Sequence, residues 1–319
     1  MHRIPVGILG GSGYAGRELG RIIGSHPQFE VAFVTANERR GELFAAGTRE
    51  LIMLPADEAP LASVELVFSA LPHGASGRWV RRVIDEGGRA IDLSSDLRPG
   101  HTELAVPYGL TELYRASLPG AQLIANPGCY PTAILLALLP LLERDLIEPG
   151  GCVTIDAASG VSGAGNSPKA ELMFAEVVEN YKAYAVGNEH RHLAEMRATV
   201  AHFGCDVDLL FTPHLLPVAR GILATITVPL RAMPNDLLGI WRERYAGEPF
   251  VEIRDAVPAL RDVVYRNVVR ISARAAANVR RPTVIVLAAI DNLVKGAAGQ
   301  AVQNANVVLG LPETTGLLA

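Results

Sequence analysis

Residues 3–16 read RIPVGILGGSGYAG, and this stretch decides the fold of the N-terminal part of the chain. Ile4, Val6 and Ile8 place apolar side chains along a short segment that runs directly into glycines. Residues 13–23 then predict a helix that ends near Gly24 and Pro27. A buried strand, a glycine turn and a helix therefore follow one another at the start of the chain.

The glycine turn has the spacing expected of a site that binds a dinucleotide. Gly10, Gly13 and Gly16 form a G-x-x-G-x-x-G pattern between the predicted strand and helix. Glycine lets the backbone approach a pyrophosphate, and the helix N-terminus offers N–H groups and a positive dipole end. The pattern is weak by itself, but the strand–turn–helix context favours binding over a tight turn with no ligand. The predicted contact residues are Gly10, Ser12, Gly13, Tyr14, Ala15 and Gly16.

The residues after the second predicted strand favour NADP over NAD. An NAD site usually has a carboxylate about 20 residues after the glycine turn. Counting from Gly16 reaches Thr35 and Asn37 instead, and Arg39 and Arg40 follow. Guanidinium groups can pair with a 2′-phosphate, although a solvated charge cluster remains the alternative.

The alternation of elements predicts an α/β fold. Strands are predicted at 3–10, 29–34, 64–71 and 89–93, with helices at 13–23 and 74–86. This order is typical of a Rossmann-type, doubly wound parallel sheet. After Asn126 the pattern changes to longer strands at 152–158, 207–212, 222–230 and 284–290, with helices at 131–142, 168–180, 190–203 and 234–245. We expect an NADP-binding domain over 1–127, joined by the C-terminal helix within 293–319, and an α+β catalytic, substrate and dimerisation domain over 128–292.

Composition excludes several classes of protein. Of 319 residues, 19% are charged and the net charge is −4, with no basic stripe for nucleic acid. The apolar run 133–142 is too short to cross a bilayer, and the first residues do not resemble a signal peptide. We therefore expect a cytoplasmic protein with reduced cysteines and no metal site.

Cys129 is the cysteine whose surroundings predict chemistry. It lies in NPGCYPT, residues 126–132, where Pro and Gly predict a turn and Pro131 fits the first turn of a helix. A thiol there faces the positive end of the helix dipole, which favours the nucleophilic thiolate. Cys152 opens an apolar strand and is predicted to be buried and inert, and Cys205 has no partner pattern.

These motifs resemble, over nearly the whole chain, the N-acetyl-gamma-glutamyl-phosphate reductase family, a relative of aspartate-semialdehyde dehydrogenase. The resemblance rests on the glycine turn, ALPHG at 70–74, DLSSDLR at 92–98, the Cys129 heptapeptide, SGVSGAG at 159–165, HRH at 190–192, RGI at 220–222 and DNLVKG at 291–296. The first domain is shorter than in many members, and His-Leu-Ala-Glu replaces the commoner His-Thr-Pro-Glu from His192.

The resemblance implies reduction of an acyl phosphate by NADPH through a thioester on Cys129, in arginine biosynthesis, by a homodimer or homotetramer. The acid/base group is expected in the His-Arg-His tripeptide. On a helix His190 and His192 would diverge, and Glu195, three residues on, could share the face of His192. We therefore favour His192, with His190 second. Arg98, Arg220, Ser159 and Gly160 are expected to bind the substrate, and Asn292 to approach the nicotinamide or ribose.

Two alternatives stay open at the level of sequence. One is a reductase of a carrier-bound aminoadipyl phosphate in lysine biosynthesis, which shares the chemistry but usually departs from the PGCYPT pattern. The other is a redox-sensing NADP-binding protein without turnover, for which Cys129 would be dispensable.

Overall fold

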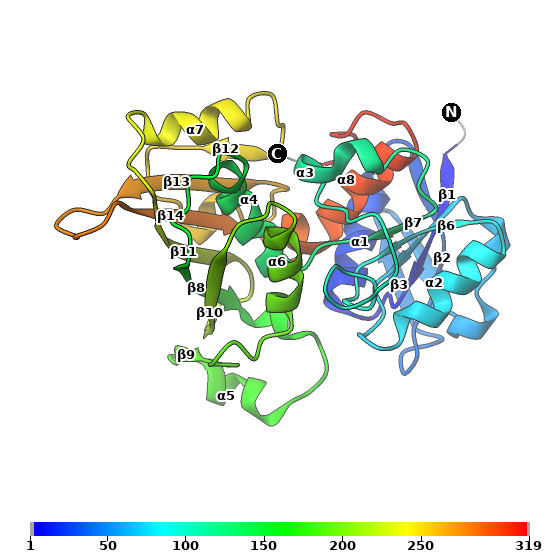
Figure 1. Cartoon of the computed structure of the whole chain (residues 1–319). Helices are drawn as coiled ribbons and strands as arrows, with labels where there is room; N and C mark the ends of the chain where they lie inside the picture. The colour runs from blue at the N-terminus through cyan, green and yellow to red at the C-terminus, as the bar shows by residue number, and fades with distance from the viewer. Residues whose placement is uncertain (1–2, 318–319) are drawn as a thin grey trace. The chain divides into compact units, whose positions relative to one another are not determined.

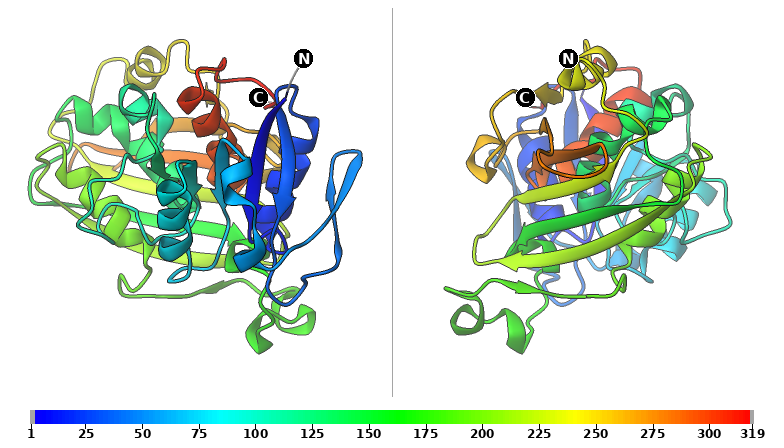
Figure 2. Two further views of the ribbon diagram at one scale, coloured as in Figure 1. Left: turned by 90° about the vertical axis from the view of Figure 1, so that its right-hand side faces the viewer. Right: turned by 60° about the vertical axis from the view of Figure 1, so that its left-hand side comes forward.

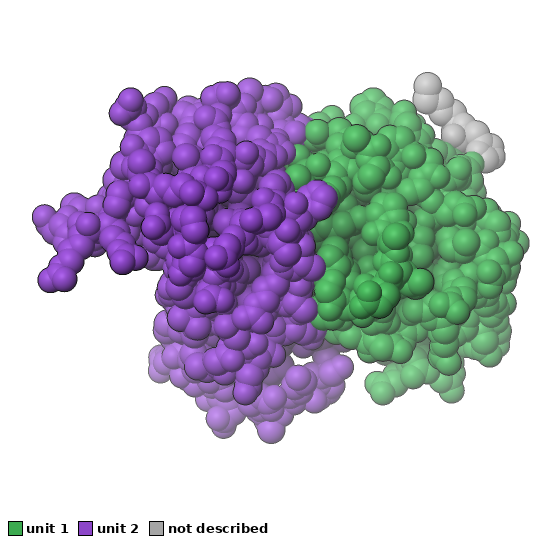
Figure 3. All heavy atoms as spheres, viewed as in Figure 1, with its two compact units in different colours: residues 1–128, 296–319 green, residues 129–295 purple. Residues whose placement is uncertain are grey.

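The computed structural model describes residues 3–317 and divides them into two compact units (Figure 3). Unit 1 contains residues 3–128 together with 296–317, and unit 2 contains Cys129–Lys295. The chain thus leaves unit 1 directly before Cys129 and returns to it directly after Lys295. Within the described residues no helix is both long enough and apolar enough to cross a membrane.

Unit 1 is built on a parallel sheet with strand order β2-β1-β5-β6-β7 (Figure 1). Its strands are β1 (Ile4–Leu9), β2 (Phe29–Val34), β5 (Leu66–Ser69), β6 (Arg89–Asp92) and β7 (Leu123–Ala125). The helices α1 (Tyr14–Ser25) and α2 (Ser76–Asp85) connect consecutive parallel strands. The predicted Rossmann-type sheet is confirmed. Its strand order reverses beside β1, the place where such sheets bind ligands at the carboxyl ends of their strands.

A hairpin of β3 (Leu43–Ala46) and β4 (Arg49–Ile52), which the sequence pattern did not predict, packs against α1. Small residues permit this approach: a Cβ on Gly24 would lie 2.1 Å from the backbone nitrogen of Gly47. A Cβ on Gly20 would overlap the ring of Phe44. The hairpin therefore lies beside the helix that follows the glycine turn.

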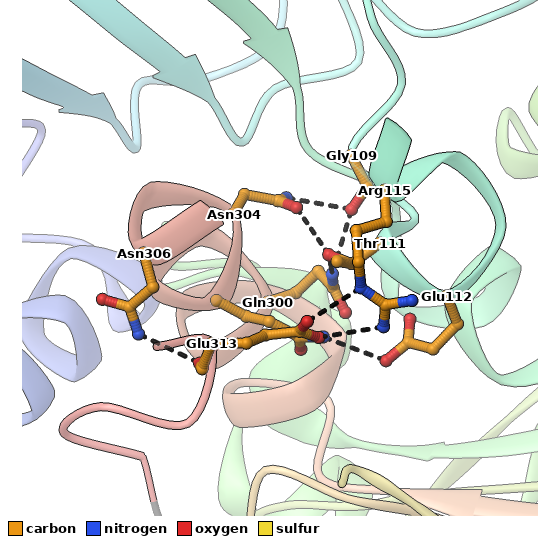
Figure 4. Close-up of polar contacts among 9 residues, drawn as sticks. Gly109, Thr111, Glu112, Arg115, Gln300, Asn304, Asn306 and Glu313 are labelled. Atoms are coloured by element: carbon orange, nitrogen blue, oxygen red, sulfur yellow. Dashed lines mark hydrogen bonds and ion pairs between the residues drawn. The ribbon is translucent and has the colours of Figure 1, made fainter. Parts of the chain in front are cut away.

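The C-terminal segment of unit 1 is anchored by buried amides, which Figure 4 shows. After the π-helical turn Val294–Ala298, helix α8 (Gly299–Val308) directs Gln300 and Asn304 toward the segment that ends in α3 (Thr111–Tyr114). Asn304 accepts a hydrogen bond from Thr111 Oγ1 at 2.7 Å and donates to Gly109 O and to Asn126 Oδ1. Asn126 belongs to the turn that leads into Cys129, so α8 helps to fix that turn.

Unit 2 contains a mixed sheet with strand order β12-β13-β14-β11-β8-β10-β9, and its long strands lie side by side in Figure 2. The strands are β8 (Gly151–Gly160), β9 (Lys182–Ala183), β10 (Val207–Leu216), β11 (Ile222–Pro229), β12 (Val251–Ile253), β13 (Val269–Ala275) and β14 (Thr283–Ile290). One face carries the buried residues and packs against α4 (Cys129–Glu143), α6 (His192–Ala201) and α7 (Leu237–Arg244). The predicted second domain of the α+β type is confirmed.

The prediction of a helix over 168–180 is wrong. The structure has only a 3₁₀ turn, Ala170–Leu172, and the short helix α5 (Phe174–Val177). Met173 and Phe174 are exposed, and Val177 is the buried residue of α5. Short helices are marginal without a buried apolar face, which explains why the pattern does not continue.

Helix α4 is buried over its whole length from Tyr130 to Leu142 and contains Pro140. Proline has no N–H, so the carbonyl of Leu136, four residues earlier, loses its partner within the helix. Tyr245, which follows α7, donates its hydroxyl to Leu136 O, and Trp241 Nε1 donates to Ala137 O at 2.9 Å. Two side chains from the α7 region thus satisfy carbonyls of the central helix.

Replacement of Tyr245 by Phe should lower the free energy of unfolding by about 1–3 kcal/mol, because it leaves a buried carbonyl unpaired. In a Pro140→Ala background the new N–H can bond Leu136 O, so the same replacement should cost much less. Urea titrations of the four proteins measure this coupling, with the exposed Tyr181→Phe as control. An equal cost of Tyr245→Phe in both backgrounds would contradict the assignment.

Candidate active site

The glycine turn of unit 1 has a backbone that only glycine accommodates. Gly10 has φ +83°, and a Cβ there would lie 2.6 Å from the carbonyl oxygen of Ala70. A Cβ on Gly16 would lie 2.4 Å from Gly10 O. Thr35, at the end of β2, fixes the turn, since its Oγ1 accepts from Gly10 N at 3.3 Å and its carbonyl accepts from Gly11 N. The turn therefore brings its backbone close to the start of α1, as a dinucleotide site requires.

A cavity of about 470 Å³ opens beside this turn. Gly11 and Ser12 of the turn line it, together with Arg17, Arg21 and Arg39. Glycine backbone and several guanidinium groups in one cavity fit the phosphate groups of NADP. Of the two arginines predicted from the sequence, Arg39 lines the cavity, whereas the Arg40 guanidinium donates to Asn37 O at 3.1 Å.

In unit 2, Cys129 is half-buried at the first residue of α4. The unpaired amides of the first helical turn make this position favourable for an anionic sulfur. The preceding turn is held from unit 1 residues: Arg98, 3% exposed, donates from Nε to Asn126 O at 2.8 Å and from Nη2 to Leu93 O at 2.6 Å. These two hydrogen bonds of Arg98 thus hold the segment that leads into Cys129 in place.

The other two cysteines lie elsewhere. Cys152 is exposed on β8, so the expectation that it is buried is wrong. Its side chain points to the face of the sheet opposite α4, α6 and α7, because strand residues alternate between faces. Cys205 lies between α6 and β10, and burial raises the pKa of its thiol. Neither thiol begins a helix.

Aromatic and imidazole rings pack around Tyr130, the residue next to Cys129. Ring centroids lie 5.5 Å from Tyr130 to His190 and 6.0 Å from Tyr130 to His192. The Tyr130 hydroxyl lies 3.1 Å from that of Tyr184, whose ring also contacts His190. Burial raises the pKa of Tyr184 to about 12, and the nearby Cys129 contributes in the same direction. Both tyrosines therefore remain neutral hydroxyl groups close to the sulfur.

The two histidines do not diverge as the sequence suggested. Helix α6 begins at His192, so His190 lies in the turn before it, and their ring centroids are 4.8 Å apart. His190 Nδ1 accepts a hydrogen bond from the His192 amide at 3.2 Å. Burial, with a smaller contribution from Arg191, lowers the pKa of His190 to about 4. His190 is therefore neutral near pH 7.

Glu195 lies in the first turn of α6, three residues after His192. Both side chains are buried, with exposed fractions of 0% for Glu195 and 5% for His192. Residues three apart on a helix are neighbours on its surface. The predicted carboxylate thus lies on the same buried face as the imidazole that it was expected to orient.

The predicted substrate loop and Arg220 meet Asn292 within unit 2. Asn292 Oδ1 accepts from Gly221 N at 2.7 Å, and its Nδ2 donates to Ser162 Oγ at 3.0 Å. A Cβ on Gly160 would lie 2.7 Å from Arg220 N, and the buried Ser159 hydroxyl donates to Gly160 O. Both amide atoms of Asn292 are therefore used to join the 159–165 loop to the turn of Arg220.

Arg220 is oriented by residues that sequence reasoning missed. Its Nη1 lies 3.6 Å from the buried Asp291 carboxylate, and its guanidinium lies 4.7 Å from the ring centroid of Tyr265. Tyr265 N also donates to Asp291 Oδ2 at 2.7 Å. Tyr130 and Tyr184 were missed as well. A tyrosine next to the predicted nucleophile and one six residues before His190 were the available signals.

Two further histidines, His73 and His214, lie outside the His-Arg-His tripeptide. The Nδ1 of His73 accepts from Ser95 N at 2.9 Å, which ties the loop before α2 to the segment after β6. His214 stacks on Tyr181 with centroids 5.0 Å apart. Each ring thus has a structural contact.

Stability should depend on the protonation of His190. Because its pKa is lower in the folded protein than the ordinary value of 6.5, the unfolded chain binds the proton more readily. The free energy of unfolding should therefore fall as the pH drops from about 6.5 to 4. In His190→Gln this decline should be smaller, whereas in the exposed His202→Gln it should persist. Chemical denaturation across this range measures the slopes, and identical slopes in wild type and His190→Gln would contradict a buried neutral imidazole.

Comparisons with known proteins agree with this geometry. Residues 5–121 match the semialdehyde dehydrogenase NAD-binding domain, and residues 129–292 match the semialdehyde dehydrogenase dimerisation domain. An N-acetyl-gamma-glutamyl-phosphate reductase of Symbiobacterium thermophilum is 44% identical over 99% of this chain and 97% of its own length. The reductase of Laribacter hongkongensis is 42% identical over 98% of each chain.

Solved structures support the fold. Aspartate semialdehyde dehydrogenase II of Vibrio cholerae superposes with a TM-score of 0.79 at 18% identity, covering 97% of this chain and 99% of that one. The Candida albicans aspartate semialdehyde dehydrogenase with NADP gives a TM-score of 0.68 at 16% identity, over 96% and 98% of the two chains. With curated relatives above 40% identity along nearly its full length, the chain belongs to the N-acetyl-gamma-glutamyl-phosphate reductase family.

Proposed function

We propose that the chain reduces N-acetyl-glutamyl 5-phosphate with NADPH to N-acetyl-glutamate 5-semialdehyde and phosphate, a step of arginine biosynthesis. The observation that carries the proposal is Cys129 at the start of the buried helix α4, with His190 and His192 packed around the adjacent Tyr130. This arrangement supplies a nucleophile, a source of protons and amide donors within one unit. The curated relatives that match this chain carry the same activity in their names.

The reaction requires a covalent step because an acyl phosphate is reduced in a controlled way only after it becomes a thioester. The Cys129 thiolate attacks the acyl carbon, a C–S bond forms, and the C–O bond to phosphate breaks. NADPH, when bound, supplies the hydride that reduces the thioester carbonyl. The oxygen of the resulting hemithioacetal then loses its proton, the C–S bond breaks, and the aldehyde leaves with Cys129 again a thiolate. Amides of the first turn of α4 are placed to stabilise the oxyanions that form on the way.

We assign the acid/base role to His192 and a positioning role to Glu195. His190 is neutral near pH 7, and its Nδ1 already accepts the His192 amide proton. It is therefore suited to hold the start of α6 and to contact substrate as a neutral group. His192 lies on the buried first turn with Glu195, where a carboxylate can support an imidazolium during proton transfer.

The anionic groups of the substrate are assigned to Arg98, Arg220 and the 159–165 loop. The Arg98 guanidinium is directed by the carbonyls of Leu93 and Asn126, directly before the nucleophile. Arg220 is directed by Asp291 and Tyr265. Bidentate guanidinium contacts with carboxylate and phosphate explain why an arginine in a fixed orientation suits this task. No observation favours the aminoadipyl substrate or a sensor without turnover.

Cys129→Ser should lower the rate by at least about 10³-fold, because the hydroxyl is a far weaker nucleophile than the thiolate. The rate is followed in reverse as NADPH formed from semialdehyde, phosphate and NADP. Cys152→Ser, an exposed thiol on another element, is the matched control and should keep wild-type activity.

A second measurement separates the covalent step from reduction. With acyl phosphate and no nucleotide, mass spectrometry of wild type and Cys152→Ser should find the acyl group on the peptide that contains Cys129. The substitution Cys129→Ser should abolish this adduct. A wild-type enzyme that turns over without ever acylating this peptide would refute the thioester.

We further propose that unit 2 pairs with a second copy through the sheet face opposite α4, α6 and α7. Leu210, Ile285 and Leu287 point to this face and alternate with the buried residues of their strands. Leu210 is 43% exposed, and the match to a dimerisation domain covers these strands. A second copy would remove these side chains from water.

Leu287→Arg should therefore shift the protein toward monomers in analytical ultracentrifugation, since a guanidinium would be buried at the interface. Leu43→Arg, at an equally apolar but 63% exposed position in unit 1, should leave the mass unchanged. A wild-type protein that sediments as a monomer, or a Leu287→Arg variant that associates normally, would exclude this face.

A further inference from the structure

An arginine that lines the cavity beside the glycine turn is paired with a carboxylate that cofactor binding alone does not explain. Glu42, directly before β3, accepts from Arg39 Nε at 2.8 Å, and the two side chains are 48% and 45% exposed. Arg39 also donates through Nη2 to the same carboxylate oxygen. The guanidinium that the sequence assigns to the 2′-phosphate of NADP is therefore already paired with an acidic group of its own loop.

A second guanidinium belongs to the same cavity. Arg17, on the first turn of α1, lines the cavity together with Arg39. Its positive charge contributes, after the hydrogen bonds from Arg39, to holding the pKa of Glu42 below its usual value. Glu42 thus lies within the field of guanidinium groups from two elements, one on α1 and one in the loop after β2.

The neighbouring arginines have different partners. Arg21 forms an ion pair at 2.6 Å with Glu18, which is 3% exposed, so its guanidinium is held against α1. Arg40 donates to Asn37 O and does not line the cavity. Arg17 and Arg39 are therefore the guanidinium groups of the cavity that can most readily interact with a phosphate in place of the Glu42 carboxylate. Exposed ion pairs contribute little free energy, so such an exchange costs little.

We propose that Glu42 holds the Arg39 guanidinium in place of the NADPH 2′-phosphate, and that the phosphate displaces this carboxylate when it binds to Arg39 and Arg17 in the cavity. The proposal rests on the assignment of this cavity to the adenosine end of NADPH. A phosphate dianion offers more charge and more acceptor oxygens than one carboxylate, so it can bind the guanidinium groups of both Arg39 and Arg17. A nucleotide without the 2′-phosphate leaves the Arg39–Glu42 pair intact and gains nothing from Arg17. Glu42 and Arg17 are then specificity-determining residues for the cofactor.

The test uses 2′,5′-ADP and 5′-AMP as probes and measures their dissociation constants by calorimetry on the full chain. Glu42→Gln should bind 2′,5′-ADP roughly two- to fivefold more tightly, because the internal competitor loses its charge. Arg17→Ala should bind it about tenfold more weakly, because a charged hydrogen bond is lost. Neither change should alter the binding of 5′-AMP. Both positions are exposed, so unfolding midpoints should stay at the wild-type value.

The matched control comes from the same loop. Glu38→Gln removes another exposed carboxylate and should bind 2′,5′-ADP like the wild type. Unchanged or weaker binding by Glu42→Gln would overturn the proposal while leaving the cavity as the cofactor site. Equal affinity of the wild type for both probes would overturn the cavity assignment and the proposal together, whereas thioester formation on Cys129 would be unaffected.

Discussion

The burial of helix α4 is the constraint on which the catalytic unit depends. The helix is apolar on every side, and Tyr130 to Leu142 are all buried. Such a helix is stable only when it is enclosed, and the sheet, α6 and α7 enclose it. Its N-terminus is thereby fixed, and Cys129 is the first residue there. The position of the nucleophile is a consequence of packing along the whole helix, together with the contacts of Arg98 and Asn304 that hold the turn before it.

A similar principle places the cofactor loop. The tight turn at Gly10 brings backbone within van der Waals distance of Ala70, and Gly16 allows α1 to approach Gly10. The close approach of α1 to the hairpin through Gly20 and Gly24 adds a wall to the cavity, formed by residues of β3 that directly follow Glu42. In a chain with a short segment between β2 and β5, this hairpin supplies part of the cavity. Glycines thus define both the phosphate loop and the cavity beside it.

The sequence predicted most elements with a clear apolar run, but it missed the short strands and also β13 (Val269–Ala275), in which Arg270 and Arg274 interrupt the apolar residues. The parallel strands of unit 1 and the long strands β8, β10, β11 and β14 were predicted because their apolar runs are clear. Short strands such as β7 and β12 have three residues each, too few to show a period. The helix at 168–180 failed because most of its large apolar residues are exposed, among them Met173, Phe174 and Val178. Cys152 was misplaced because a strand pattern does not say which face a helix covers.

The candidate site shows the same division between local and long-range information. Glycine spacing and the Cys129 turn are local patterns, so they were available from the sequence. The contacts among Tyr130, Tyr184 and His190 join residues up to sixty positions apart, and no single motif contains them. These contacts nevertheless distinguish His190 from His192. Because aromatic rings bury His190 and lower its pKa to about 4, that imidazole cannot hold a proton near neutrality. In the proposed mechanism a proton that leaves the thiol must then go to another base, and the adjacent imidazole of His192, which shares the buried face of α6 with Glu195, meets this need.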